Sequence, residues 1–221
     1  MKYNKLLSVL IIITVLLLCL FNFGRSLWHP VYIKLIGGRT INEVTIEIES
    51  KKPYLIGLSQ GSLSIIVIKD EKKLYLFNDE KLIDTIPVLA ASGKLGPKIK
   101  RGDNQVPEGV YNISVLNSNS SYYLSAKISY PNTMDFERSN KLKVEDLGDD
   151  IYIHGKSASV GCIAIGDDKI EDLFYLLSKR IINKVNVIIA PVNFNKFNLP
   201  DNLPNDIVYD KVKVELKKYK L

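Results

Sequence analysis

The sequence predicts a mainly β domain with one or two helices, preceded by an N-terminal transmembrane helix. Three observations support this prediction. An uncharged, apolar run extends over residues 6–24. From residue 62 onward, short runs of β-branched and aromatic residues alternate with polar turns, a pattern typical of strands. One later stretch, residues 168–179, has strong helical periodicity. A chain of 221 residues, 46% of them hydrophobic, can hold one globular domain with additional segments at its ends.

The apolar run indicates where the protein is expected to reside. Lys2 and Lys5 precede it, and at ~1.5 Å per residue a helix over residues 6–24 would match the ~30 Å hydrocarbon core of a membrane. The run is long for a secretory signal peptide and no small-residue cleavage site follows, which favours an uncleaved anchor over residues 1–27. The lysines predict that the N-terminus stays in the cytoplasm and that the rest of the chain lies outside. Secretion after signal cleavage is the alternative.

Residues 28–61 form a lead-in segment in which a short helix is expected. Thr40 and Glu43 have the spacing of a capping box, and apolar residues follow at helical spacing from Ile41. The apolar residues between positions 44 and 48 also alternate, so that a strand stays open as an alternative.

The β-rich part begins at residue 62, where polar turns between the apolar runs favour antiparallel hairpins. Residues 117–121 have the composition of such a turn, and residues 133–150 that of an irregular polar segment. The strands are expected at residues 63–68, 74–77, 82–89, 111–116, 122–130, 151–153 and 185–190.

The helix expected over residues 168–179 carries an apolar stripe that includes Ile170, Phe174 and Leu177. Asp168 and Glu171 have capping-box spacing at its start. A linker and a basic, helical tail are expected after the last strand. The chain is therefore divided into an anchor (1–27), a lead-in (28–61), a globular domain (62–193) and a basic C-terminal tail (194–221).

The charge of the chain limits its expected partners. The formal net charge is +6 and the pI about 9.1, with lysines concentrated in the last eleven residues. No basic stripe carries interleaved aromatic residues, so nucleic acid is not expected as a partner. The charge would suit an anionic membrane or an anionic polymer such as the cell wall, and a merely solvated lysine-rich surface is the alternative.

The candidate site is the nonapeptide from His154 to Cys162. It contains one of the two histidines and one of the two cysteines of the chain. Cys19 lies in the apolar run, which leaves Cys162 without an expected disulfide partner and makes it a candidate reactive thiol. An imidazole can take the thiol proton and later return it, because its ordinary pKa of ~6.5 lies near neutrality. A structural histidine and an inert buried cysteine are the alternatives.

Small residues between these two side chains suit a tight catalytic loop, and Gly155, Ser159 and Gly161 are expected to support it. A glycine directly before the cysteine frees backbone N–H groups to point at a developing oxyanion. No metal site is expected, because one histidine and one cysteine supply two ligands where zinc needs three or four.

The order of these residues resembles the active-site motif of the YkuD-type L,D-transpeptidases, which is His-Gly, a variable loop and Ser-x-Gly-Cys. It stands here as His154-Gly155 and Ser159-Val160-Gly161-Cys162. The short loop and the residues after the cysteine are similar to the YafK-like branch of the family. The resemblance covers about residues 62–193, which makes it far more specific than the motif alone. Further blocks that resemble this branch are residues 92–93, 96–98, 102–103, 106–111, 116–120, 130–132 and 150–153.

This resemblance implies a β-sandwich-like catalytic domain in the bacterial cell envelope. Together with the predicted N-terminal anchor, it leads us to expect a domain that is held in the inner membrane and faces the periplasm. It implies action on peptidoglycan stem peptides without a metal or an organic cofactor. By the family pattern, Cys162 attacks the carbonyl of an L-centre residue joined to a D-centre, and His154 acts as base and then as acid. A backbone carbonyl is expected to orient the histidine. The residues expected at the substrate rim are Lys98, Asp103 and Glu108.

The same resemblance leaves the fate of the acyl-enzyme thioester open. Many members of the family have an arginine two positions after the cysteine, whereas this chain has Ala164. Transfer to an amine, which is transpeptidation, is the first expectation. The alternative is hydrolysis, either as an L,D-carboxypeptidase or as an amidase that releases a wall-attached protein. A non-catalytic wall-binding protein on a degenerate fold is a third, different class.

Overall fold

A computed structural model of the chain describes residues 2–23, 25–204 and 206–221, with the backbone alone for residues 2–6, 20–23, 25 and 26. The chain divides into one unit that ends at Arg39 and a second, Thr40–Leu221. The first unit consists of helices α1 (Lys2–Phe23) and α2 (Arg25–Ile36). Across the described residues, no helix is both long and apolar enough to cross a membrane, so the transmembrane helix predicted over residues 6–24 is not supported. Residue 24 of that predicted span lies outside the described residues.

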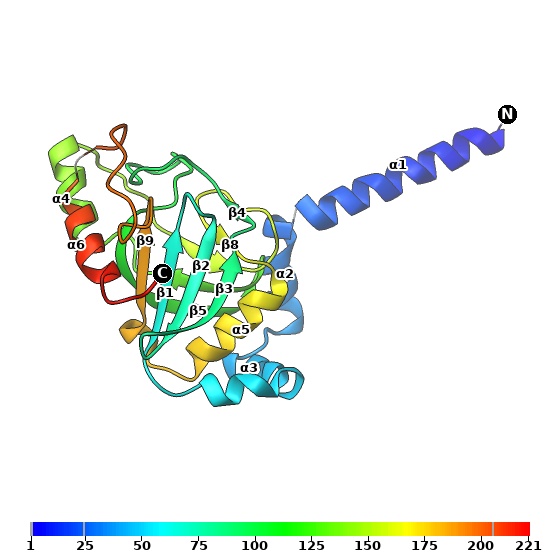
Figure 1. Ribbon diagram of the computed structural model, residues 1–221. Coiled ribbons are helices and arrows are strands. Elements are labelled where there is room, and N and C mark those ends of the chain that lie inside the picture. Colours follow the sequence, from blue (N-terminus) through cyan, green and yellow to red (C-terminus); the bar gives the residue numbers. More distant parts are fainter. Residues whose placement is uncertain (1, 24, 205) are drawn as a thin grey trace. The chain divides into compact units, whose positions relative to one another are not determined.

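The second unit is built on one mixed sheet (Figure 1). In the described part of the chain this sheet has nine strands in the order β3-β2-β1-β9-β5-β6-β7-β8-β4. Their bounds are β1 (Leu63–Ile68), β2 (Lys73–Asn78), β3 (Lys81–Pro87), β4 (Ala90–Ala91), β5 (Gly109–Ser120), β6 (Tyr123–Ile128), β7 (Tyr152–His154), β8 (Ile163–Ala164) and β9 (Asn186–Ala190).

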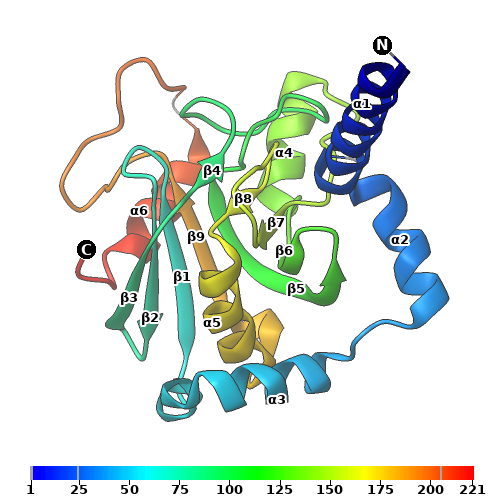
Figure 2. The same ribbon diagram turned by 90° about the vertical axis from the view of Figure 1, so that its right-hand side faces the viewer.

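The sheet is a half-barrel and not the β-sandwich-like structure that the sequence suggested. The predicted antiparallel hairpins are present, but β1 pairs with β9 and β7 with β8 in parallel. Figure 2 shows β5 as a long, curved strand. Its residues 109–112 pair with β9 and its later residues pair with β6, with an irregular register between Ile113 and Val115. Because β5 bends at such an irregularity and continues, the two halves form one sheet.

Helices cover both faces of this sheet. They are α3 (Ile41–Lys51), α4 (Thr133–Leu142), α5 (Asp167–Ser178) and α6 (Ile207–Leu216), with short 3-10 helices η1 (Pro53–Leu58) and η2 (Ile182–Lys184). Strand β1 shows how the faces differ. Ile65 and Val67 belong to the cluster that contains α3 and α5, whereas Ile66 and Ile68 belong to the cluster that contains α6. Successive side chains of a strand point to opposite faces, so a strand that is buried on both faces needs apolar residues at consecutive positions. This explains the apolar run from Ile65 to Ile68.

The helices test the local predictions. Thr40 and Glu43 form the predicted capping box, with each backbone N–H bonded to the other side chain, so the predicted helix is confirmed. The predicted capping box at Asp168 is wrong, because α5 begins after Gly166 and Asp168 lies in its first turn. Helix α4 falls in the segment predicted to be irregular. Its mostly polar sequence has little apolar periodicity, and a capping box at Asn132 starts it instead.

The predicted strands are confirmed in position, with one error in β5, whereas the two-residue strands β4 and β8 were not predicted. The polar residues 117–121 were expected to form a turn, but β5 continues to Ser120. Asn117 pairs with Ser125, and Ser120 with Tyr123, so that pairing with β6 outweighs the polar composition. The turn itself is limited to Ser121 and Tyr122.

Candidate active site

Strands β7 and β8 bring the two predicted catalytic residues together. His154 is the last residue of β7, and Cys162 directly precedes β8. The parallel pairing of Ile153 with Ile163 fixes the two segments side by side. Both side chains line one cavity of about 280 Å³, and the other lining residues are Asn117, Ser120, Ser121, Tyr122, Ser125, Asp150 and Tyr152.

The surroundings of His154 favour a neutral imidazole in which Nδ1 carries the hydrogen and Nε2 is the acceptor. The side chain is buried, and Nδ1 lies 2.6 Å from the carbonyl oxygen of Gly155. Because a carbonyl only accepts, Nδ1 must carry the hydrogen. Burial lowers the pKa of His154, and the bond to Gly155 opposes this effect in part. Nε2 lies 3.3 Å from Oγ of Ser159, so the serine hydroxyl can donate to it.

The surroundings of Cys162 favour a protonated thiol. Its Sγ accepts a hydrogen bond from the backbone N–H of Tyr152 at 3.4 Å and donates to the carbonyl oxygen of Asp150 at 3.5 Å. Burial raises the pKa of the Cys162 thiol, while the N–H of Tyr152 and the positive charge of Lys98 lower it. The thiol therefore needs a base to become a nucleophile at neutral pH, and His154 is the base that shares its cavity.

The two glycines of the motif serve different geometric needs. A Cβ on Gly155 would lie 2.6 Å from Oδ1 of Asp167 and 2.8 Å from the carbonyl oxygen of Tyr122, so no larger residue fits there. Gly161 has φ +80°, a conformation that favours glycine. Its N–H donates to Oγ of Ser92 at 2.6 Å, and this bond already occupies the group that the sequence suggested as an oxyanion donor.

The three predicted rim residues occupy different positions. Lys98 is buried and not exposed at a rim as predicted, and it forms a 2.6 Å ion pair with Asp103. Asp103 also accepts hydrogen bonds from the backbone N–H groups of Ile99 and Lys100. These contacts hold together the two ends of the loop over residues 98–103. Lys98 lines a neighbouring cavity of about 130 Å³ together with Gly161, so the loop borders the motif.

Glu108 is not at a rim, because its side chain is completely buried. One carboxylate oxygen accepts from Nζ of Lys69 and from the N–H of Gly96, both at 2.7 Å, and the other accepts from the hydroxyl of Tyr209 at 2.6 Å. These partners are Lys69 directly after β1, Gly96 in the loop after β4, and Tyr209 in α6. The buried ion pair between Lys69 and Glu108 and its hydrogen bonds therefore join segments that are distant in the sequence. Local sequence patterns do not predict such contacts.

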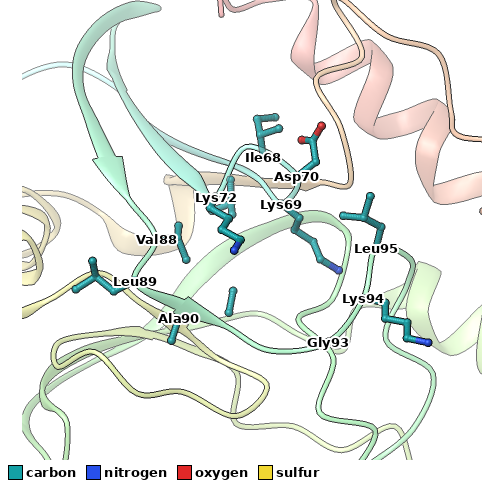
Figure 3. Close-up of a pocket in the computed structure, with 12 residues that line it drawn as sticks. Ile68, Lys69, Asp70, Lys72, Val88, Leu89, Ala90, Gly93, Lys94 and Leu95 are labelled. Atoms are coloured by element: carbon teal, nitrogen blue, oxygen red, sulfur yellow. The ribbon is translucent and has the colours of Figure 1, made fainter.

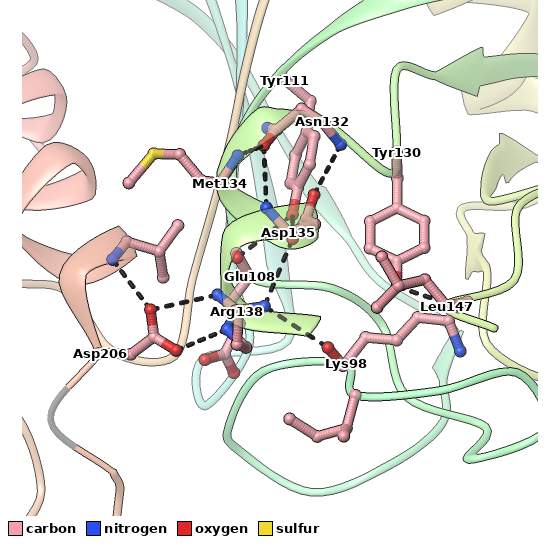
Figure 4. Close-up of polar contacts among 12 residues, drawn as sticks. Lys98, Glu108, Tyr111, Tyr130, Asn132, Met134, Asp135, Arg138, Leu147 and Asp206 are labelled. Atoms are coloured by element: carbon pink, nitrogen blue, oxygen red, sulfur yellow. Dashed lines mark hydrogen bonds and ion pairs between the residues drawn. The ribbon is translucent and has the colours of Figure 1, made fainter. Parts of the chain in front are cut away.

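A second buried ionic cluster contacts the loop that contains Lys98 and Asp103 (Figure 4). The guanidinium of Arg138, on α4, lies between the carboxylates of Asp135 and Asp206, and it also donates to the carbonyl oxygen of Lys98 at 3.5 Å. Asp206 caps the N-terminus of α6 through the N–H of Val208. Arg138 thus connects α4, α6 and the loop that borders the motif. The sequence analysis missed it because nothing local predicts this pairing.

Arg138→Ala is expected to destabilise the fold by about 3 kcal/mol, because it leaves two carboxylates without their buried partner. Chemical denaturation of the variant measures this loss. Arg101→Ala is the control, since the Arg101 side chain is 59% exposed and its ion pair with Asp146 is on the surface. Equal losses for the two variants would contradict the importance assigned to the cluster.

Another cavity among the described residues lacks this chemistry. Figure 3 shows a cavity lined by the end of β1 and the turn after it, residues 88–89 after β3, β4, and the loop that follows β4. Its volume is about 370 Å³. Lys69, Lys72 and Lys94 lie on it with apolar side chains such as Val88 and Leu95, but no cysteine or histidine does. Among the described residues, no group of three or more His, Cys, Asp or Glu side chains could hold a metal ion.

Comparison with known proteins agrees with the motif. The family model of the YkuD L,D-transpeptidase catalytic domain matches residues 62–192, more than half of the chain. The chain belongs to this family. It is 29% identical over 157 residues to YafK of Escherichia coli (strain K12), whose name assigns it provisionally to the L,D-transpeptidases. That match covers 67% of this chain and 61% of YafK.

Two solved structures are also similar to this chain. Bd1075 of Bdellovibrio bacteriovorus has a TM-score of 0.44 and 20% identity, over 72% of this chain and 55% of that one. L,D-transpeptidase 1 of Mycobacterium tuberculosis has a TM-score of 0.34 and 14% identity, over 58% of this chain and 62% of that one.

Proposed function

We propose that this protein is a cysteine L,D-transpeptidase of the bacterial cell envelope that acts on peptidoglycan stem peptides. One observation carries the proposal: Cys162 and His154 line the same cavity, and His154 is bonded so that Nε2 is an acceptor. Family membership supplies the reaction class. A histidine oriented by a backbone carbonyl agrees with what the sequence resemblance implies.

The first half of the proposed reaction forms a thioester. Nε2 of His154 takes the thiol proton, and Sγ of Cys162 attacks the carbonyl carbon of an L-centre residue joined to a D-centre. The N–H of Tyr152, which already donates to Sγ, stabilises the thiolate before the attack. The tetrahedral intermediate then collapses, and His154 returns the proton to the leaving amine.

The second half decides between two activities. Attack on the thioester by an amine completes transpeptidation, and attack by water gives an L,D-carboxypeptidase or an amidase that releases wall-attached protein. Hydrolysis is the second candidate because Ala164 replaces the arginine found in many members. Ala164 is completely buried in β8, so this position offers no charged group to a substrate.

The test uses the full-length protein and two kinds of substrate. A carbapenem should add one acyl group per chain, which intact mass measures and peptide mapping should place at Cys162. With disaccharide-tetrapeptides, a cross-linked dimer indicates transfer and a tripeptide product indicates trimming. With wall-linked peptides, a freed lysine-terminated peptide indicates release. A folded protein that gives neither an adduct nor any of these products would be the non-catalytic wall-binding protein.

A further inference from the structure

The segment that carries the nucleophile, residues 159–162, is held from two sides by neighbouring strands. In the sheet, β8 lies between β7 and β4. The last pairs of the two ladders are Ile153 with Ile163 and Ala91 with Ile163. One step further along both ladders, Cys162 therefore lies between Tyr152 on the β7 side and Ser92 on the β4 side.

At this step, side-chain atoms accept the hydrogen bonds that backbone carbonyls accept within the sheet. On the β7 side, the N–H of Tyr152 donates to Sγ of Cys162 at 3.4 Å. On the β4 side, the N–H of Gly161 donates to Oγ of Ser92 at 2.6 Å. The Ser92 hydroxyl in turn donates to the carbonyl oxygen of Asn104, also at 2.6 Å. Ser92 thus ties the nucleophile segment to both ends of the loop 92–104.

We propose that Ser92 is a positioning residue for Cys162. Its hydroxyl fixes the left-handed turn at Gly161, and this turn keeps Sγ against the N–H of Tyr152 inside the catalytic cavity. The N–H of Gly161 is directed toward β4, whereas Sγ contacts the β7 side, so this N–H anchors the segment and does not bind the oxyanion. The expected effect of Ser92 on the acylation rate rests on the proposed function, whereas its expected effect on the pKa of the Cys162 thiol does not.

Removal of the Ser92 hydroxyl should change the pKa of the Cys162 thiol. Gly161 is buried, so its N–H would lose its partner without free access to water. A glycine turn without this tie can move, and Sγ would then leave the N–H of Tyr152. A thiolate that loses a backbone donor is less stable, and the pKa of the thiol should rise.

The experiment uses the full chain with Cys19→Ser, so that Cys162 is the one remaining thiol. The rate of alkylation by iodoacetamide is followed by intact mass across the pH range, and acylation by a carbapenem is followed at neutral pH. Ser92→Ala should shift the alkylation profile to higher pH, with a rate at pH 7 about threefold to tenfold lower. Acylation, which also needs alignment with His154, should fall by tenfold or more.

Three further variants serve as controls. Ser92→Thr and Ser92→Val differ by the hydroxyl, and only the threonine should keep the wild-type profile. Ser178→Ala removes a remote hydroxyl that also bonds a backbone carbonyl, and it should change neither rate. Melting temperatures show whether each variant is folded. If Ser92→Ala does not fold, the comparison of threonine with valine decides.

Several results would overturn the proposal. A lower melting temperature with an unshifted alkylation profile would show that Ser92 stabilises the fold and does not position the thiol. Faster acylation in Ser92→Ala would mean that the hydroxyl blocks an oxyanion donor. If the wild-type protein is not acylated, the proposed function fails, whereas alkylation, which needs no acyl chemistry, still tests the role of Ser92.

Discussion

Cys162→Ser is expected to lower the rate of acyl-enzyme formation by at least ~10⁴-fold, because a hydroxyl is a far weaker nucleophile than a thiolate beside the same base. The substitution should leave the fold intact. A serine oxygen can keep both polar contacts of Sγ, with the N–H of Tyr152 and the carbonyl of Asp150. A time course of carbapenem acylation, read by intact mass, measures the loss.

Cys19→Ser is the matched control, since it makes the same chemical change at the other cysteine of the chain. It should be acylated at the wild-type rate. An adduct that persists in Cys162→Ser and disappears in Cys19→Ser would show that Cys19 is acylated, and it would contradict the assignment of Cys162 as the nucleophile. An adduct that forms at the same rate in both variants would show that the carbapenem modifies another side chain.

His154→Gln is expected to lower the acylation rate at neutral pH by ~10²–10⁴-fold, the range for loss of a general base. Glutamine is chosen because its amide can still donate to the carbonyl oxygen of Gly155, so that the loop keeps its support. What the variant loses is an acceptor that can take a proton from the thiol.

The pH profile separates this role from a structural one. The base acts when it is neutral, so the wild-type rate should fall as the pH drops through the pKa of His154. Burial lowers that pKa, which places this acidic limb below the ordinary value of ~6.5. In His154→Gln the limb should vanish. The rate should then rise only toward alkaline pH, as the thiol with its raised pKa ionises by itself.

His29→Gln is the control for this profile, because it changes the only other histidine. It should keep the acidic limb in place. A limb that persists in His154→Gln would show that another group is the base. A profile that is lost in His29→Gln would contradict the assignment in the same way.

Local signals accounted for the parts of the fold that the sequence predicted. The capping box at Thr40 and the apolar stripe from Ile170 depend on residues within one or two turns, so a helix could be expected from each. The apolar runs of β1 and β9 predicted strands for the same reason. Helix α4 begins with a local capping box at Asn132, but it lacks such an apolar stripe, so it was missed. Long-range contacts of Arg138 connect it to the rest of the fold.

The site divides in the same way between sequence and tertiary structure. The sequence alone determined the candidate nucleophile, the candidate base and the family, because the motif keeps these residues within nine positions. It did not determine the direction of the N–H of Gly161, the burial of Glu108 or the partner of Arg138. Ser92 lies 69 positions from Gly161, and Arg138 lies 68 positions from Asp206. Only the order and register of the strands, and the packing of helices on them, brought these residues together.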